Sequence, residues 1–437
     1  MEWLTYTELL ALLLSLFGIS LLARSLVKTP SIVVLNLLTS VQALVIRPVA
    51  IHWNGGSEIY SSVYDPSVYA RGWLAAALFY LTWAIGYGWG SGFGHQELLV
   101  KSFQRSSNRF LLQSLFIAVV ISVFVGAMLA VAGTSFLIGN REGAIATVNP
   151  VLRYLYPFVM LLSALGGFYA IILMFIRRPF LGVALLVIFF FLTSLVGQRG
   201  FLITFALGAA GVIYIFIKRT LRQRTVLLAT VALIISATAL MREIIYTFMD
   251  LRPEKSESSA IQTYLRNPDG DYVEVWMVLL NYSGEHGQQL GRTILAAPAT
   301  ILPNDTRRSL GMLTGLDVLN NYYQPEAYWG LKFGFNVSLL QELFLNFGYY
   351  GLLLVPIAGY GCGRAVTRYY RRVSSGADPG AEFFLLFGIW TLSTSFAGLQ
   401  WTLLSFVIYV IFQLLSMKRK KITGSLVSTP GSVPVAG

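Results

Sequence analysis

The sequence predicts an all-α protein that crosses a membrane many times, and three observations carry this prediction. The chain of 437 residues is 56% hydrophobic and only 12% charged, about half the charged fraction of an ordinary soluble domain. Its mean hydropathy is +0.66. Apolar runs of 17 or more residues recur along the chain, and as helices such runs are long enough to cross a ~30 Å hydrocarbon core.

We expect about eleven transmembrane helices, eight before one long polar interruption and three after it. The expected spans are 4–23, 31–51, 72–90, 110–132, 152–176, 180–196, 201–217, 225–241, 340–362, 381–397 and 400–416. The first run has no basic region before it, so it is interpreted as a retained span rather than a signal peptide. The chain then divides into spans one to eight (1–241), a long loop with short helices (242–339), spans nine to eleven (340–417) and a tail (418–437) that is expected to be disordered.

The distribution of lysines and arginines predicts the orientation of the chain. One set of alternate connections holds nineteen of them, whereas the opposite short connections and span ends hold five. By the positive-inside rule the nineteen mark the cytoplasmic side. The C-terminus is then cytoplasmic, and the N-terminus and long loop are outside, which in a bacterial inner membrane means the periplasm. The net charge of +12 is therefore attributed to topology and not to nucleic-acid binding.

Two arginines are expected near the outer interface. Arg199 is at the tip of Gly197-Gln198-Arg199-Gly200, which joins two short spans with almost no loop. A lone cation at the edge of hydrocarbon is costly without an anionic partner, so Arg199 is either an interfacial anchor or an anion clamp that faces lipid phosphates. Arg47 precedes Pro48 at a span end and either snorkels to the headgroups or contacts substrate.

The long loop carries most of the polar chemistry, because eleven of the twenty acidic residues lie between 242 and 341. Arg242, Arg266 and Arg292 are its candidate anion-binding residues. His286, beside Glu285 and six residues before Arg292, is either a solvated loop histidine or a general base. An aromatic group that suits either sugar stacking or a membrane interface follows: Tyr322, Tyr323, Tyr328, Trp329, Phe333 and Phe335.

The ninth span contains Glu342, Asn346 and Tyr349 at i, i+4 and i+7, so they are expected on one helical face. A carboxylate inside an apolar run must face a cavity or a cation. We expect an outer arginine as the partner of Glu342, in a site or in a structural ion pair. No metal or other cofactor is expected, because the sequence has no P-loop and no metal-ligand spacing. The Asp269-Gly270-Asp271 triplet matches a metal-binding pattern but also fits a turn.

Three features give the chain a resemblance to the Wzy-type O-antigen polymerases, which are related to the O-antigen ligases. They are the 197–200 hairpin followed by a basic inner loop, the single long outer loop, and Leu340-Gln341-Glu342-Leu343 with Asn346-Phe347-Gly348-Tyr349-Tyr350-Gly351. Ligases typically open this last segment with a His-Asn pair, whereas this chain has Phe335-Asn336. That departure argues against a ligase and removes its expected catalytic histidine.

The resemblance implies a GT-C-like membrane glycosyltransferase that joins oligosaccharide repeat units carried on undecaprenyl diphosphate, with no metal or other cofactor. Its partners would be the lipid-linked oligosaccharide, membrane lipid, a chain-length regulator and a repeat-unit flippase. Arg199 with Arg242, Arg266 or Arg292 would bind the diphosphate, and Glu342 or His286 would activate the acceptor hydroxyl. The remaining substrate contacts would be Arg47, Asn336, Asn346 and Tyr349.

The competing class is a transporter or flippase of lipid-linked sugars. Such proteins usually have paired repeats and broken helices at mid-membrane. The sequence shows no internal repeat and places its polar residues outside rather than in the middle of the spans, which favours an enzyme. A structural partner of a polysaccharide machine is the third alternative.

Overall fold

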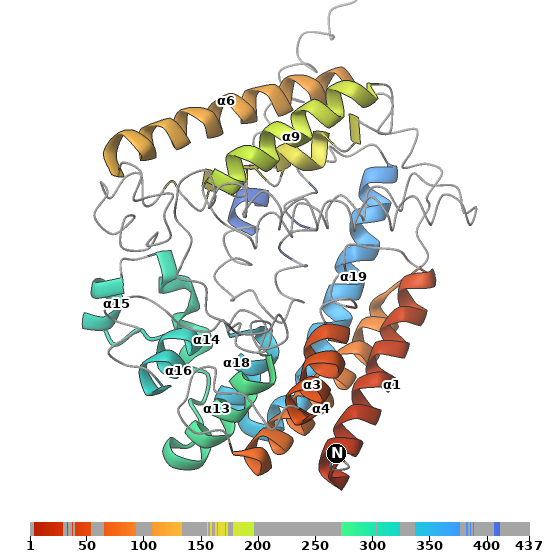
Figure 1. Ribbon diagram of the computed structural model, residues 1–437, viewed down its shortest axis with the longest axis vertical. Coiled ribbons are helices and arrows are strands. Elements are labelled where there is room, and N and C mark those ends of the chain that lie inside the picture. The colour runs from red at the N-terminus through yellow and green to blue at the C-terminus, as the bar shows by residue number, and fades with distance from the viewer. Residues whose placement is uncertain are drawn as a thin grey trace, which may run out of the picture.

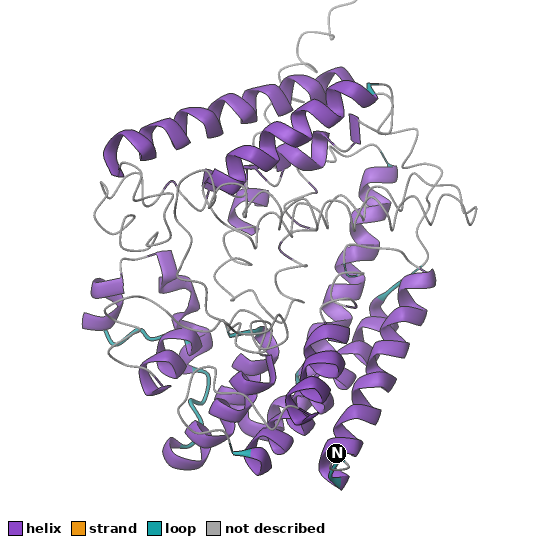
Figure 2. Cartoon of the chain, in the orientation of Figure 1, coloured by secondary structure: helices purple, strands orange, loops and turns teal. Residues whose placement is uncertain are grey.

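The computed structural model describes residues 4–28, 40–53, 65–92, 107–132, 178–195, 272–301, 304–323 and 337–375, with shorter pieces between 155 and 173 and between 382 and 410, and the single residues Val33 and Leu37. The regular structure of these residues is helical, without a strand (Figure 2). Three helices in them are long and apolar enough to cross a membrane, or four if a bent pair counts as one span. The prediction of an all-α, membrane-embedded protein is confirmed for this part of the chain.

Four predicted spans correspond to helices of the structure. They are α1 (Tyr6–Lys28), α4 (Pro66–Gly90), α6 (Ser107–Ala132) and α9 (Pro179–Leu195). Of the predicted 31–51 span, the described end forms a π-helix, η1 (Gln42–Ile46), and α3 (Arg47–Trp53). The spans predicted at 201–217 and 225–241 and the tail at 418–437 lie outside the described residues, as do large parts of 152–176, 381–397 and 400–416.

α4 is the central helix of a bundle with α1 and α19 (Val355–Ser374) (Figure 1). Asp65 caps its start, since its side chain accepts hydrogen bonds from the N–H groups of Ser67 (2.8 Å) and Val68 (3.3 Å). Glycines at both interfaces let the backbones approach closely, because a Cβ on them would meet the facing helix. The facing pairs are Gly18 with Tyr80, Gly88 with Ser25, Gly86 with Pro356 and Gly90 with Tyr360.

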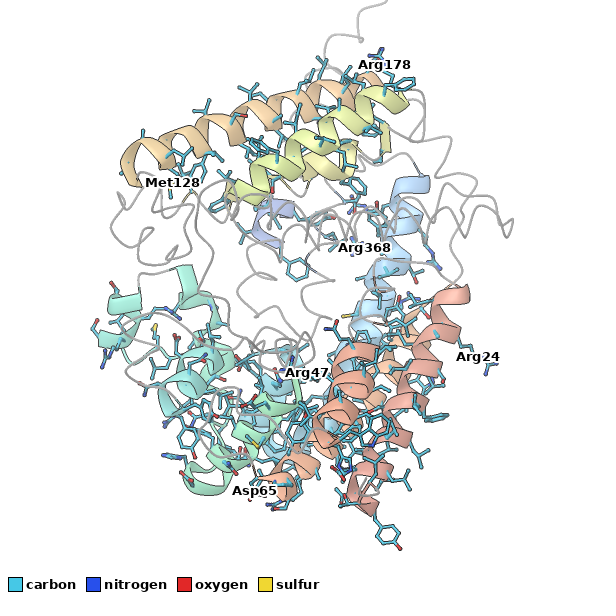
Figure 3. The ribbon with its side chains drawn as sticks, in the orientation of Figure 1. Arg24, Arg47, Asp65, Met128, Arg178 and Arg368 are labelled. Carbon is cyan, nitrogen blue, oxygen red and sulfur yellow. The ribbon has the colours of Figure 1, made fainter. Side chains whose placement is uncertain are left out.

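The direction of the three helices follows from these pairs. Residue numbers rise together along both interfaces, so α1, α4 and α19 run in the same direction. α1, α4 and α19 belong to the predicted spans one, three and nine, and odd-numbered spans must run in the same direction if successive spans alternate. Arg24 of α1 and Arg368 of α19 lie toward one end of the bundle, and Asp65 lies at the other (Figure 3).

α6 and α9 pack against each other at the end of the molecule away from the N-terminus (Figure 1). Arg178, just before α9, donates a hydrogen bond to Asn108 Oδ1 at 3.1 Å. Large apolar side chains stay exposed on both helices, including Phe116 (69%) and Phe191 (47%). Exposed apolar surface of this kind is expected of helices that contact lipid.

The prediction of one continuous helix at 340–362 is wrong. α18 (Leu339–Phe347) is followed by a 3-10 helix, η5 (Gly348–Leu353), and then by α19, and the two halves of the pair meet at 89°. Gly348 caps the end of α18, and its φ of +56° is a conformation that glycine adopts without steric cost. Pro356, in the first turn of α19, has no N–H with which to continue a helix from η5.

Part of the long polar loop folds into short helices, which gather on the side of α18 opposite α1 (Figure 1). They are α13 (Tyr272–His286), α14 (Arg292–Ala296), the 3-10 helix η4 (Ala297–Ile301), α15 (Asn304–Ser309) and α16 (Gly315–Tyr323). The buried Trp276 of α13 lies between Phe79 of α4 and Phe344 of α18, with ring centroids 4.9 and 5.4 Å away. This aromatic contact fixes α13 on the membrane helices and positions the loop helices that follow it.

Candidate functional site

Glu342 is the centre of a buried polar cluster. It lies in the first turn of α18 and is 4% exposed. Its Oε2 accepts a hydrogen bond from the hydroxyl of Thr293 in α14 at 2.6 Å, and its Oε1 accepts one from the N–H of Gly315 in α16 at 3.1 Å. Thr293 and Gly315 are 49 and 27 residues away in the chain. The carboxylate therefore joins three short helices at one point.

Asn346 completes this cluster from the next turn of α18. Its amide nitrogen donates to the Thr293 hydroxyl at 2.6 Å and to the Glu342 carbonyl at 2.7 Å. Its Oδ1 accepts from the N–H of Gly291 at 2.8 Å, and its carbonyl accepts from the N–H of Leu290 at 3.0 Å. The predicted placement of Glu342 and Asn346 on one helical face is confirmed, and both side chains are hydrogen-bonded to Thr293 of α14.

A second buried carboxylate, Asp317, lies beside the first. Arg307 of α15 donates to both of its oxygens, at 2.6 Å to Oδ2 and 3.3 Å to Oδ1. The N–H and hydroxyl of Thr314 also donate to Oδ2, at 3.0 and 2.7 Å. Thr314 immediately precedes Gly315, so this bidentate ion pair fixes the turn whose N–H reaches Glu342. The two carboxylates are thus parts of one hydrogen-bonded unit.

The expected arginine partner of Glu342 is not found among the described residues. Its hydrogen bonds come from neutral donors, and the nearby Arg307 is paired with Asp317 instead. The backbone of Gly315 occupies the space beside the carboxylate: it lies so close that a Cβ at this position would be only 2.5 Å from Glu342 Oε1. Because glycine has no side chain, the backbone of α16 approaches the carboxylate and its N–H takes the place of a cation.

Tyr349 does not share the face of Glu342 and Asn346, so that prediction is wrong. α18 ends at Phe347, and Tyr349 belongs to the 3-10 helix η5. Its side chain is 54% exposed and its ring packs edge-on against Phe344, with centroids 5.3 Å apart. The i+7 position requires a continuous helix, which the chain interrupts at Gly348.

The two described arginines among the predicted binding residues differ in burial. Arg47 begins α3 and is 1% exposed, so it does not snorkel to a surface (Figure 3). Arg292 is exposed at the first position of α14, next to Thr293 of the buried cluster. It is the predicted anion-binding residue that the structure brings close to Glu342.

His286 lies at the end of α13 in a cluster of rings rather than in a solvated loop. Its imidazole stacks on Tyr282, with centroids 4.8 Å apart and planes 5° from parallel. Its Nδ1 is 3.9 Å from the Glu285 carboxylate, beyond hydrogen-bond distance. The neighbour that was expected to activate it as a base is therefore present but does not bind it.

Four of the predicted site residues, Arg199, Arg242, Arg266 and Asn336, lie outside the described residues, and the proposed arginine clamp stays a prediction. Within the described ranges no group of three or more histidine, cysteine, aspartate or glutamate side chains is placed to hold a metal ion.

Thr293, Arg307 and Asp317 were not predicted from the sequence as members of a site. A local signal existed for the last of these, since Thr314-Gly-Leu-Asp317 has the spacing of a capping box at the start of α16. No local signal links Thr293 or Arg307 to the cluster, because their partners are far away in the chain or in another helix.

The fold and the cluster together define a membrane-embedded α-helical protein with a buried polar site where a polar loop meets a broken helix. Comparisons of the chain with protein-family models, with curated proteins and with solved structures gave no match.

Proposed function

We propose that the protein is a membrane glycosyltransferase of GT-C-like architecture, which polymerises oligosaccharide repeat units carried on undecaprenyl diphosphate. The reaction would take place at the periplasmic face of a bacterial inner membrane. The observation that carries the proposal is the buried cluster of Glu342, Asn346, Thr293, Asp317 and Arg307. Burying two carboxylates in an otherwise apolar protein is costly, and buried ionisable groups in membrane proteins usually serve function.

The reaction requires a base and a cation; Glu342 of the cluster is the candidate base, and the arginines near the cluster are the candidate cations. An acceptor hydroxyl oxygen would attack the anomeric carbon of the growing chain, and its proton would pass to Glu342. The bond from the anomeric carbon to the phosphate oxygen would break, and the diphosphate would leave with the electron pair. Arginines bind such oxygens through planar forks of donors, and electrostatic stabilisation of the developing charge is usually the largest catalytic contribution.

Arg292 is the described arginine best placed for the diphosphate. It is exposed and immediately precedes Thr293, whose hydroxyl donates a hydrogen bond to Glu342. Arg199, Arg242 and Arg266 are the further candidates. Glu342 is closed off by Thr293 and Gly315 in the structure, so the acceptor hydroxyl would have to replace one of these donors; catalytic hydrogen bonds often form only in the substrate complex.

The test is polymer synthesis by the purified protein in liposomes that contain lipid-linked repeat unit, or laddering of lipopolysaccharide in cells. Glu342→Gln keeps the size of the side chain but removes its basicity, so polymer should fall at least 100-fold. Glu8→Gln is the matched control, because Glu8 is also buried and hydrogen-bonded, to Thr5 and His52. Normal polymer from Glu342→Gln at normal protein level would refute the catalytic role.

A second candidate function rests on the bent helix pair. The pair α18 and α19 is bent by 89°, and broken helices are a common feature of transporters. Such a protein would move labelled lipid-linked unit across a liposome membrane without lengthening it. Flipping without polymer, abolished by the same Glu342→Gln change, would replace the polymerase proposal with this one.

A further inference from the structure

Three rings form a compact aromatic cluster beside the carboxylate site. His286 stacks on Tyr282, and Tyr322 of α16 stands edge-on to both, with centroids 5.3 Å from His286 and 5.2 Å from Tyr282. Aromatic groups on two different loop helices, α13 and α16, thus meet in one place. Tyr282 is 8% exposed, whereas the His286 side chain is 50% exposed. Since the buried Tyr282 covers one face of the imidazole, the exposed face is the opposite one.

The rings are held in place by a polar contact underneath. The side-chain amide of Gln289 donates to the Tyr282 hydroxyl at 2.6 Å. The N–H of the same residue donates to the Leu345 carbonyl of α18 at 3.0 Å. Leu345 lies between the residues of α18 that build the carboxylate cluster. The ring stack is therefore attached to the same turn of α18 as Glu342 and Asn346.

Polar groups border the exposed imidazole face. The Glu285 carboxylate is 62% exposed and interacts with the Tyr322 hydroxyl. Partial burial, together with the hydrogen bond to and the negative charge of Glu285, raises the pKa of Tyr322 to about 12. The phenol donates its proton to Glu285 in this contact, so its own oxygen and the remaining lone pairs of the carboxylate can accept hydrogen bonds from the hydroxyls of a ligand.

We infer that the exposed face of His286, backed by Tyr282 and flanked by Tyr322, is a platform on which one pyranose ring of the glycan stacks, with Glu285 and Tyr322 hydrogen-bonded to its hydroxyls. The inference rests on the proposed function for the identity of the ligand as a glycan. A flat ring edged by a carboxylate and a phenol matches a sugar, which has an apolar face of C–H groups and hydroxyls around its rim. His286 then acts through its ring and not as a base.

The experiment separates a ring role from a proton-transfer role. His286→Phe keeps a flat ring but cannot take a proton, whereas His286→Ala removes both. Full-length protein in nanodiscs is probed by saturation-transfer NMR with methyl glycosides of glucose, galactose, N-acetylglucosamine and rhamnose, and with choline. We expect saturation of the C–H protons of at least one glycoside, about tenfold weaker binding to His286→Ala, and binding to His286→Phe within about twofold of the original.

Three outcomes would overturn the platform: no glycoside binds, choline is saturated instead of the glycosides, or His286→Phe loses as much binding as His286→Ala. Tyr6→Ala is the matched control for the loss of an exposed ring, because Tyr6 is 95% exposed at the start of α1. Polymer synthesis is measured on the same preparations. Glycoside binding without polymer would refute the proposed function and leave the platform. Polymer from the original protein without glycoside binding would refute the platform and leave the proposed function.

Discussion

Replacement of Gly315 by alanine tests the contact between α16 and the Glu342 carboxylate. The new Cβ would lie 2.5 Å from Oε1 and 2.6 Å from Cδ of Glu342. Carbon and oxygen atoms need about 3.5 Å, so the carboxylate has to move by about 1 Å and loses the Gly315 N–H bond. Overpacking costs about 1–3 kcal/mol, and a lost bond to a charged group costs about 1.5–3 kcal/mol. Because the two effects overlap, we expect about 3 kcal/mol of destabilisation.

The assay is thermal unfolding of the protein in nanodiscs at one scan rate. A loss of this size should lower Tm by about 3 °C, at roughly 1 °C per kcal/mol for a chain of 437 residues. Gly284→Ala is the control, because a Cβ on Gly284 in α13 would meet nothing within 4 Å. In the Glu342→Ala background the same change at Gly315 should cost less than about 1 kcal/mol. Equal costs in both backgrounds would refute the reasoning, since the clash would then lie elsewhere.

Three further predictions follow from a buried ion pair, a helix interface and a helix cap. Arg307→Met leaves the Asp317 carboxylate buried without its cation and should cost about 3–5 kcal/mol in thermal unfolding, most of it recovered when Asp317→Leu is added. Gly359→Leu should reduce the monodisperse fraction on size exclusion, because a Cβ there would meet α4, whereas Gly361→Leu should not. Hydrogen bonds from Ser67 and Val68 hold the pKa of Asp65 below its usual range. The stabilisation by this ionised cap is present above the unfolded pKa of about 3.9 and is lost as pH falls through the folded value; Asp65→Asn, an uncharged cap, should flatten this acid dependence of Tm.

Local patterns in the sequence predicted the parts of the fold that local forces decide. Long apolar runs predicted the ends of α1, α4 and α6 to within six residues, and the i, i+4 spacing placed Glu342 and Asn346 together. The same spacing failed for Tyr349, because the backbone of Gly348 adopts a positive φ that ends α18. A glycine in an apolar run is read as a packing residue as easily as a helix end, so the 89° bend was not expected.

The donors of Glu342 could not be predicted from the sequence, for a different reason. The general rule that a buried carboxylate needs a partner was correct, but it favours arginine only where an arginine side chain can reach the carboxylate. At Gly315 the missing side chain brings a backbone N–H to 3.1 Å, and Thr293 supplies a neutral hydroxyl at 2.6 Å. Both contacts depend on how α14 and α16 pack on α18, which no local pattern in the chain encodes.

The neutral environment of Glu342 affects where an anionic substrate can bind. The charge of an arginine paired with this carboxylate would be neutralised, and the arginine would bind phosphate poorly. Arg307 is in this situation, because it is paired with Asp317. Arg292 instead stays exposed, one residue from the Thr293 that bonds Glu342. In the proposed polymerase this separation lets an exposed guanidinium hold the departing diphosphate while the acceptor hydroxyl approaches the carboxylate. In a direct Arg–Glu pair, which was predicted from the sequence, the guanidinium and the carboxylate would bind each other, and neither would be free to contact the substrate.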